Sequence, residues 1–195
     1  MHIEQALAAS RKATRPLAAA VVGDARRLDL PDDSADAVLL LGPLYHLTER
    51  TDRLRALTEV RRVLRPGGPL LAAAISRFAS VIDGLVKQFL VEPAFETIVE
   101  RDLQDGQHRN PTREPAWFTT AFFHLPGELE RELVEAGLAE VEVLAIEGPG
   151  AWLPNLDEWL ADADRRDLLL RTLRRIEREP SVLGAGSHLL GVGRA

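Results

Sequence analysis

Three short apolar runs, at residues 18–22, 37–41 and 70–75, contain no polar alternation and are bounded by Gly, Pro or Asp. Such runs are typical of strands in a sheet that is covered on both faces. Between the last two runs, residues 48–64 place apolar side chains three and four positions apart, at Leu54, Leu57, Val60 and Leu64. This spacing predicts a helix that packs by one face.

A strand, a crossover helix and a strand in this order form a right-handed parallel unit. Thr48 is placed to cap the helix, and Pro66-Gly67-Gly68 is placed to end it. Open α/β sheets bind ligands at the carboxyl ends of their strands. The loops that should carry function therefore lie at residues 23–36, at residues 42–48 and from Ser76 onward.

Four segments follow one another across this region. They are Val22-Gly-Asp-Ala-Arg26, Leu30-Pro-Asp-Asp-Ser-Ala-Asp36, Ala37-Val-Leu-Leu-Leu-Gly-Pro-Leu-Tyr-His-Leu47 and Glu59-Val-Arg-Arg-Val-Leu-Arg-Pro-Gly-Gly68. In order and spacing they resemble the middle of a class I S-adenosylmethionine-dependent methyltransferase. The resemblance implies a Rossmann-like, doubly wound α/β fold whose mostly parallel sheet has an antiparallel last strand.

The same resemblance implies S-adenosylmethionine as cofactor and suggests which residues contact it. Asp24 and Ala25 match the positions that contact adenine, the first through its carboxylate and the second through its backbone N–H. Gly42 and Pro43 match the loop that passes the methionine part of the donor, where a backbone must come close.

The beginning of the chain departs from the family's pattern. Apart from a helix expected at residues 1–12, the residues upstream of Val21 contain no Gly-x-Gly turn, so the first two strands of the family are expected to be missing. The strand expected at residues 18–22 then has no neighbour, and unpaired buried backbone groups cost about 1–3 kcal/mol each. A late start codon, a fragment, an exchanged or repaired dimer interface, or a second polypeptide that completes the sheet would each account for this.

A helical insertion is expected at residues 78–118, within a single domain that spans residues 1–195. Residues 78–90 and 93–103 have helical spacing, and residues 107–117 form a polar loop. In the family, an insertion at this place shapes the acceptor pocket, and its closure would exclude water. Alternatively, the two helices are extra core at the sheet edge.

The rest of the chain should close the fold. The pattern predicts helices at 128–136 and 156–178 and strands at 141–145 and 188–193. The last two strands resemble the antiparallel pair that ends the family's sheet.

Methyl transfer needs mainly alignment and desolvation of the acceptor, and a general base is required only when the acceptor must lose a proton early. His46 and Tyr45 are the catalytic candidates, because they follow the second visible strand. His124 and Trp117 are candidates for contact with the acceptor. For each histidine, packing or hydrogen bonding to backbone is the alternative role, and for Trp117 it is packing in an aromatic core.

Composition narrows the classes of function. The chain has 195 residues, no cysteine, a net charge of -6 and 46% apolar residues, so it can bury a full core but cannot form a thiolate site. An acidic chain of pI near 5.4 is atypical of a nucleic-acid-binding surface. No apolar run approaches the roughly 20 residues of a membrane span, which favours a cytoplasmic protein. The five histidines are far apart, so no metal site is expected.

Three functions remain. The resemblance favours methyl transfer to a small-molecule substrate. A degenerate, non-catalytic protein that binds a ligand or partner is the alternative, supported by the absence of the glycine turn. A nicotinamide-dependent oxidoreductase is the third. The chain lacks the Gly-x-Gly-x-x-Gly motif that such enzymes use, which argues against this function.

Overall fold

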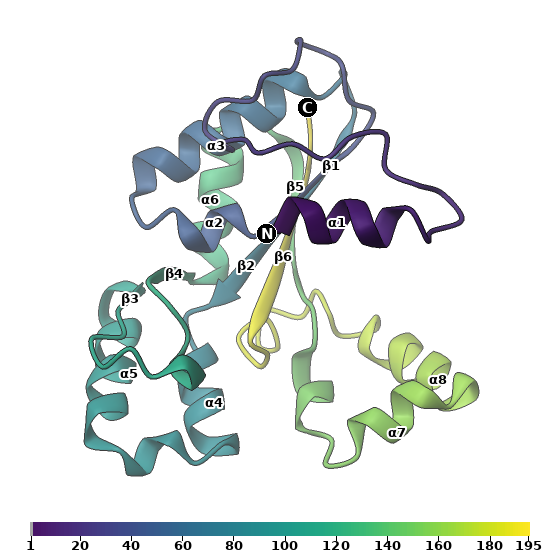
Figure 1. Cartoon of the computed structure of the whole chain (residues 1–195). Coiled ribbons are helices and arrows are strands. Elements are labelled where there is room, and N and C mark those ends of the chain that lie inside the picture. The colour runs from purple at the N-terminus through teal and green to yellow at the C-terminus, as the bar shows by residue number, and fades with distance from the viewer. Residues whose placement is uncertain (1) are drawn as a thin grey trace.

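The computed structural model describes residues 2–195, which form a six-stranded sheet with helices around it (Figure 1). The order along the sheet is β3-β4-β2-β6-β5, and β1 also pairs with β2. The strands are β1 (Val38–Leu41), β2 (Pro69–Ser76), β3 (Gln107–His108), β4 (Ala121–His124), β5 (Ala139–Ala145) and β6 (His188–Arg194).

Strand β2 is the centre of the sheet. Its first half pairs with β1 and its last two residues, Ile75 and Ser76, pair with β4, both in parallel. Strand β6 runs antiparallel to β2 and to β5 on either side of it. Among the described residues, β1, β2, β4 and β5 therefore share one direction. The mostly parallel α/β sheet with an antiparallel last strand is confirmed.

The helices follow the predicted periodicity, with shifted ends. They are α1 (His2–Ser10), α2 (Pro43–His46), α3 (Arg50–Val63), α4 (Ala79–Val86), α5 (Pro93–Asp105), α6 (Pro126–Glu135), α7 (Leu156–Ala161) and α8 (Ala163–Leu173), with 3₁₀ turns η1 (Phe89–Val91), η2 (Pro115–Trp117) and η3 (Gly148–Trp152).

Two details of the predicted helices are wrong. Glu49, not Thr48, is the N-cap residue of α3, and its side chain makes no capping bond. The single helix expected at residues 156–178 is divided at Asp162, whose extended backbone ends α7 and whose carboxylate accepts from the N–H of Arg165 at 2.9 Å. A side chain that caps a new helix favours a break there.

The main core lies where α3 and α6 cover one face of the sheet. Leu57 of α3 and Leu133 of α6 are fully buried against Leu70 of β2. On the other face, Leu39 and Leu41 of β1 remain 65% and 61% exposed. The expectation that this strand is covered on both faces is therefore wrong. Each face of a strand is buried only if another layer packs on it, and the described chain leaves this part open.

The strand predicted at residues 18–22 is also wrong. The segment has no strand structure, and Val21 and Val22 are 78% and 89% exposed. An apolar run forms a strand only when a neighbouring strand takes up its N–H and C=O groups, and no described strand pairs with this segment. Further along this loop, the guanidinium of Arg62 donates hydrogen bonds to the carbonyl oxygens of Leu28, at 3.0 Å, and Leu30, at 2.8 Å.

Two helical insertions extend from the same end of the sheet (Figure 1). Helices α4 and α5 lie between β2 and β4 in the chain, at the expected residues, and α7 and α8 lie between β5 and β6. This end is the carboxyl end of β2, where open α/β sheets bind ligands.

Candidate functional site

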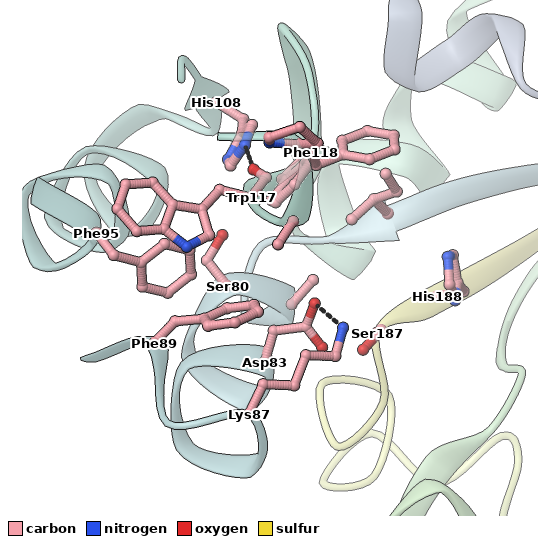
Figure 2. Close-up of a pocket in the computed structure, with 15 residues that line it drawn as sticks. Ser80, Asp83, Lys87, Phe89, Phe95, His108, Trp117, Phe118, Ser187 and His188 are labelled. Atoms are coloured by element: carbon pink, nitrogen blue, oxygen red, sulfur yellow. Dashed lines mark hydrogen bonds and ion pairs between the residues drawn. The ribbon is translucent and has the colours of Figure 1, made fainter. Parts of the chain in front are cut away.

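A cavity of about 310 Å³ lies where the carboxyl end of β2, the α4–α5 insertion and the beginning of β6 meet (Figure 2). Its volume is near the lower limit of small-molecule pockets, about 300–1,000 Å³. Its lining combines aromatic and polar side chains, among them Ser80, Asp83, Lys87, Phe89, Phe95, His108, Trp117, Phe118, Phe123, Ser187 and His188.

One side of the cavity is an aromatic wall built on the insertion. The ring of Phe95 lies 5.3 Å from the ring of Phe89 and 5.3 Å from that of Trp117, centroid to centroid. Such tilted and edge-to-face pairs are favourable for aromatic rings and hold them in place. The wall therefore offers a planar ligand a fixed apolar surface.

Buried hydrogen bonds position this wall. His108 donates from Nε2 to the carbonyl oxygen of Trp117 at 2.8 Å, and its Nδ1 lies 2.8 Å from Oδ2 of Asp102. The hydroxyl of Ser80 bonds to the same carboxylate oxygen, and all three side chains are buried. Helices α4 and α5 and the loop around Trp117 are thus held to one another.

The opposite side of the cavity is polar. Asp83 of α4 and Lys87, the C-cap residue of that helix, form an ion pair of 2.8 Å, which Figure 2 shows between the aromatic wall and His188. His188 begins β6 opposite Ile75, which places it at the carboxyl end of β2. Its Nδ1 lies 2.5 Å from Oε1 of Glu147.

The contact between His188 and Glu147 changes the pKa of both side chains. The hydrogen bond to Glu147 raises the pKa of His188, although partial burial opposes this. Burial tends to raise the pKa of Glu147, but the hydrogen bond and the charge of His188 outweigh it, so the pKa of Glu147 is lowered. Between these two pKa values the pair is ionic.

Three predicted site residues lie at or beside this cavity. Trp117 lines it, and Tyr45 packs against Ile75 and Phe123 at its base. The ring of Phe118 lies 6.3 Å from that of Tyr45 and 6.1 Å from that of His46. Phe118 thus connects the short helix α2 to the cavity.

His124 lies elsewhere. It is fully buried, its Nε2 is 3.3 Å from Glu132, and it does not line the cavity. Burial lowers its pKa. The structure brings it together with Arg53 and Glu132 under α6, whereas Trp117 belongs to the cavity.

Of the residues expected to contact the methyl donor, some have a geometry that suits this role and one is already paired with another side chain. Gly42 has a φ of 135°, which side-chain-bearing residues rarely adopt, and it gives a bare backbone turn before Pro43 begins α2. Ala25 is partly buried against the main core. The carboxylate of Asp24, however, already accepts both Nε and Nη2 of Arg26, at 3.0 and 2.7 Å. This hydrogen bonding lowers the pKa of Asp24 to about 2.

Sequence reasoning missed the polar side of the cavity. Lys87 and Asp83 lie within the predicted lid helix, but their role depends on which face of α4 meets the cavity. His188 could have been found, because it is the first residue of an apolar strand that was expected to run antiparallel, so that the start of this strand lies at the ligand-binding end of the sheet. Glu147 carries no such signal, since it lies 41 residues from His188.

The part of the chain that the structure describes offers neither a cluster of metal-binding side chains nor a membrane-spanning helix. Residues 2–195 contain no group of three or more His, Cys, Asp or Glu side chains that could hold a metal ion. Over the same range, the helices are too short or too polar to cross a membrane.

Comparison with known proteins places residues 2–72 in a family described as methyltransferase domain. Ubiquinone/menaquinone biosynthesis C-methyltransferase UbiE of Caulobacter vibrioides is 40% identical over 76 residues, which are 39% of this chain and 29% of the relative. A probable tRNA methyltransferase 9B of Homo sapiens is 38% identical over 52 residues, which are 27% of this chain and 12% of the relative. The chain thus matches less than a third of the length of these relatives.

Solved structures share the fold over nearly the whole chain. A SAM-dependent methyltransferase from Methanosarcina mazei has a TM-score of 0.56 and 17% identity, with 98% of this chain and 76% of that chain covered. The [4+2]-cyclase SpnF has a TM-score of 0.50 and 20% identity, with 98% and 62% covered. Residues 2–72 thus match a methyltransferase domain, and nearly the whole chain shares the fold of a solved SAM-dependent methyltransferase.

Proposed function

We propose that this chain takes part in methyl transfer from S-adenosylmethionine to a small-molecule acceptor, which binds in the cavity of about 310 Å³. The observation that carries the proposal is the position of this aromatic-walled cavity. It opens at the carboxyl end of β2, and Tyr45 and Phe118 connect it to the turn at Gly42. Donor and acceptor sites in this arrangement are neighbours, as a direct transfer requires.

Each side of the proposed site has its own residues. The backbone of Gly42 and Pro43 would run past the methionine part of the donor. Asp24 and Ala25 would contact its adenine, and Asp24 would release Arg26 in order to bind the base. The bound donor supplies an electrophilic methyl group. The insertion that carries Trp117 holds the acceptor and excludes water, which strengthens the electrostatic interactions inside the site. Tyr45 and His46 lie next to Phe118, between the turn at Gly42 and the cavity.

Calorimetric titration of the 195-residue chain with S-adenosylmethionine tests the donor half, with the oligomeric state measured in the same buffer. We expect micromolar binding, weakened in Asp24→Ala because the adenine loses its carboxylate partner. Asp36→Ala is the matched control, since Asp36 is another loop aspartate that is paired with an arginine. Equal affinity in Asp24→Ala and the wild type would reject Asp24 as an adenine contact.

Binding of a ligand without methyl transfer is the second candidate, and the occupied carboxylate of Asp24 favours it. The fold itself does not decide, because SpnF, a [4+2]-cyclase, shares it. A folded sample that binds no S-adenosylmethionine as a monomer or as an oligomer would support this second function. Binding of the donor would support the first.

A further inference from the structure

We propose that His188, held by Glu147, is the proton acceptor for an acceptor molecule that carries a phenol-like hydroxyl. This inference rests on the proposed function, since it names the acceptor class and a catalytic residue of the same cavity. His188 lies across the cavity from the aromatic wall, on a different strand from every residue expected from the sequence to act there (Figure 2).

The geometry around His188 fixes which of its ring nitrogens can react. Nδ1 lies 2.5 Å from Oε1 of Glu147, and Oε2 of the same carboxylate accepts the backbone N–H of His188 at 3.1 Å. A carboxylate in this position holds hydrogen on Nδ1. In the neutral imidazole Nε2 then carries the lone pair, and none of the described residues forms a hydrogen bond with it. A base oriented by a third group in this way is a common catalytic arrangement.

The other side of the cavity indicates the class of acceptor. The rings of Phe89, Phe95 and Trp117 favour a planar aromatic ring. A neutral imidazole accepts a proton efficiently only from a group whose acidity is not far from its own. A phenol, with a pKa of about 10, meets this condition far better than an aliphatic alcohol. The ion pair of Asp83 and Lys87 leaves this part of the cavity without a net charge to attract a strongly charged ligand.

The step balances in atoms and charge. The hydroxyl oxygen forms a bond to the methyl carbon, and the carbon–sulfur bond breaks with its electron pair moving to sulfur. The O–H proton moves to Nε2 of His188. The products are an aryl methyl ether, a neutral thioether and an imidazolium whose charge is stabilised by the carboxylate of Glu147.

The proton acceptor works only when His188 is neutral. The charged groups near it are Glu147, Asp83 and, paired with Asp83, Lys87. The hydrogen bond to Glu147 raises the pKa of His188 above its ordinary value near 6.5. Proton acceptance therefore increases as the pH rises through this raised pKa. The contribution of the His188–Glu147 ion pair to stability changes in the opposite sense. It is complete below the pKa of His188 in the unfolded chain and is lost as the pH rises through the pKa of His188 in the folded protein.

The test uses 4-nitrophenol as the probe and needs no methyl donor. Bound to the 195-residue chain, the probe should show more of the yellow phenolate than the free probe at the same pH, because His188 takes its proton. His188→Asn keeps a donor for Glu147 and removes Nε2. We expect this variant to bind the probe while the bound phenolate fraction falls to that of the free probe.

Glu147→Gln is the second variant, and it covers the case in which His188→Asn does not fold. Its amide oxygen still accepts from Nδ1 but carries no charge, so an intermediate phenolate fraction is expected. Failure of the wild type to bind 4-nitrophenol, or equal ionisation in the wild type and a folded variant, would overturn the inference. Because the assay contains no S-adenosylmethionine, it can succeed even if donor binding fails, and the two proposals fail separately.

Discussion

Replacement of Arg53 by methionine is expected to lower the free energy of unfolding by about 3–5 kcal/mol, because it leaves the carboxylate of Glu132 buried without its partner. Arg53 and Glu132 are only 2% and 3% exposed, and Nη2 of Arg53 lies 2.7 Å from Oε1 of Glu132. The guanidinium also donates to the carbonyl groups of Leu47 at 3.1 Å and Thr48 at 2.9 Å. It stacks 3.6 Å above the ring of Phe122.

Urea denaturation followed by circular dichroism measures this loss. The matched control is Arg50→Met on the same helix, since Arg50 is 52% exposed and contacts Glu132 only at 3.9 Å. Exposed ion pairs contribute little, so the control should lose much less. Equal losses of unfolding free energy in the two variants would show that the buried ion pair contributes no more to stability than the exposed one.

The same network predicts a pH dependence. Burial tends to raise the pKa of Glu132, but its hydrogen bonds to His124 and Arg53 outweigh this and lower the pKa to about 2. A carboxyl whose folded pKa is lowered contributes stability above its unfolded value of 4.5, and this stability is lost as the pH falls toward 2. In Arg53→Met this acid-dependent part of the stability should shrink.

Replacement of Gly106 by alanine is expected to be the other strongly destabilising change. Gly106 has a φ of 74°, and an added Cβ would lie 2.4 Å from the carbonyl oxygen of Phe123. Its own carbonyl oxygen accepts from the N–H groups of His108 and Phe123 at 3.0 and 2.8 Å, so α5, β3 and β4 meet here. The backbone cannot move away from the new methyl group without breaking these bonds.

Gly67→Ala separates the two causes of strain. Gly67 has nearly the same φ, 77°, but an added Cβ would have no atom within 4 Å. Its loss should reflect the left-handed conformation alone, about 1–2 kcal/mol. Gly106→Ala should lose about 1–3 kcal/mol more through overpacking. Thermal denaturation of both variants measures the difference, and similar losses would mean that the backbone around Gly106 adapts.

Gly106 also links stability to the proposed site. The residues that it joins carry His108, which holds Trp117 over the cavity. If the insertion is an acceptor lid, Gly106→Ala should weaken binding of 4-nitrophenol at temperatures at which the protein is still folded. If the insertion is only extra core, binding should be unchanged under the same conditions.

Much of the fold could be predicted because the signals are local. The runs at residues 37–41 and 70–75, with the helix between them, form a parallel unit whose patterning needs no knowledge of distant residues. The run at residues 18–22 has the same apolar pattern, yet it forms no strand. Apolar patterning reports only the tendency to be buried, whereas a strand also needs a neighbour for its backbone hydrogen bonds.

The candidate site was predictable on one side only. Tyr45, His46 and Trp117 follow strands or belong to the insertion, so the order of elements places them near the carboxyl end of the sheet. His124 ends β4, which was not among the predicted strands, and its side chain lies beneath α6 in the Arg53–Glu132 network. Near the end of a strand, a shift of one residue turns a side chain to the opposite face of the sheet, and sequence patterns rarely define strand ends that closely.

The sequence by itself determined the α/β class, the parallel unit around β2, the place of the helical insertion and the resemblance of residues 2–72 to a methyltransferase domain. Local periodicity, turn residues and short motifs are sufficient for these. Only the tertiary structure decided that Glu147 orients His188 and that Asp102 and His108 hold Trp117 in the cavity wall. Such pairs join residues from different elements, and their contact depends on how the whole chain packs rather than on any pattern along it.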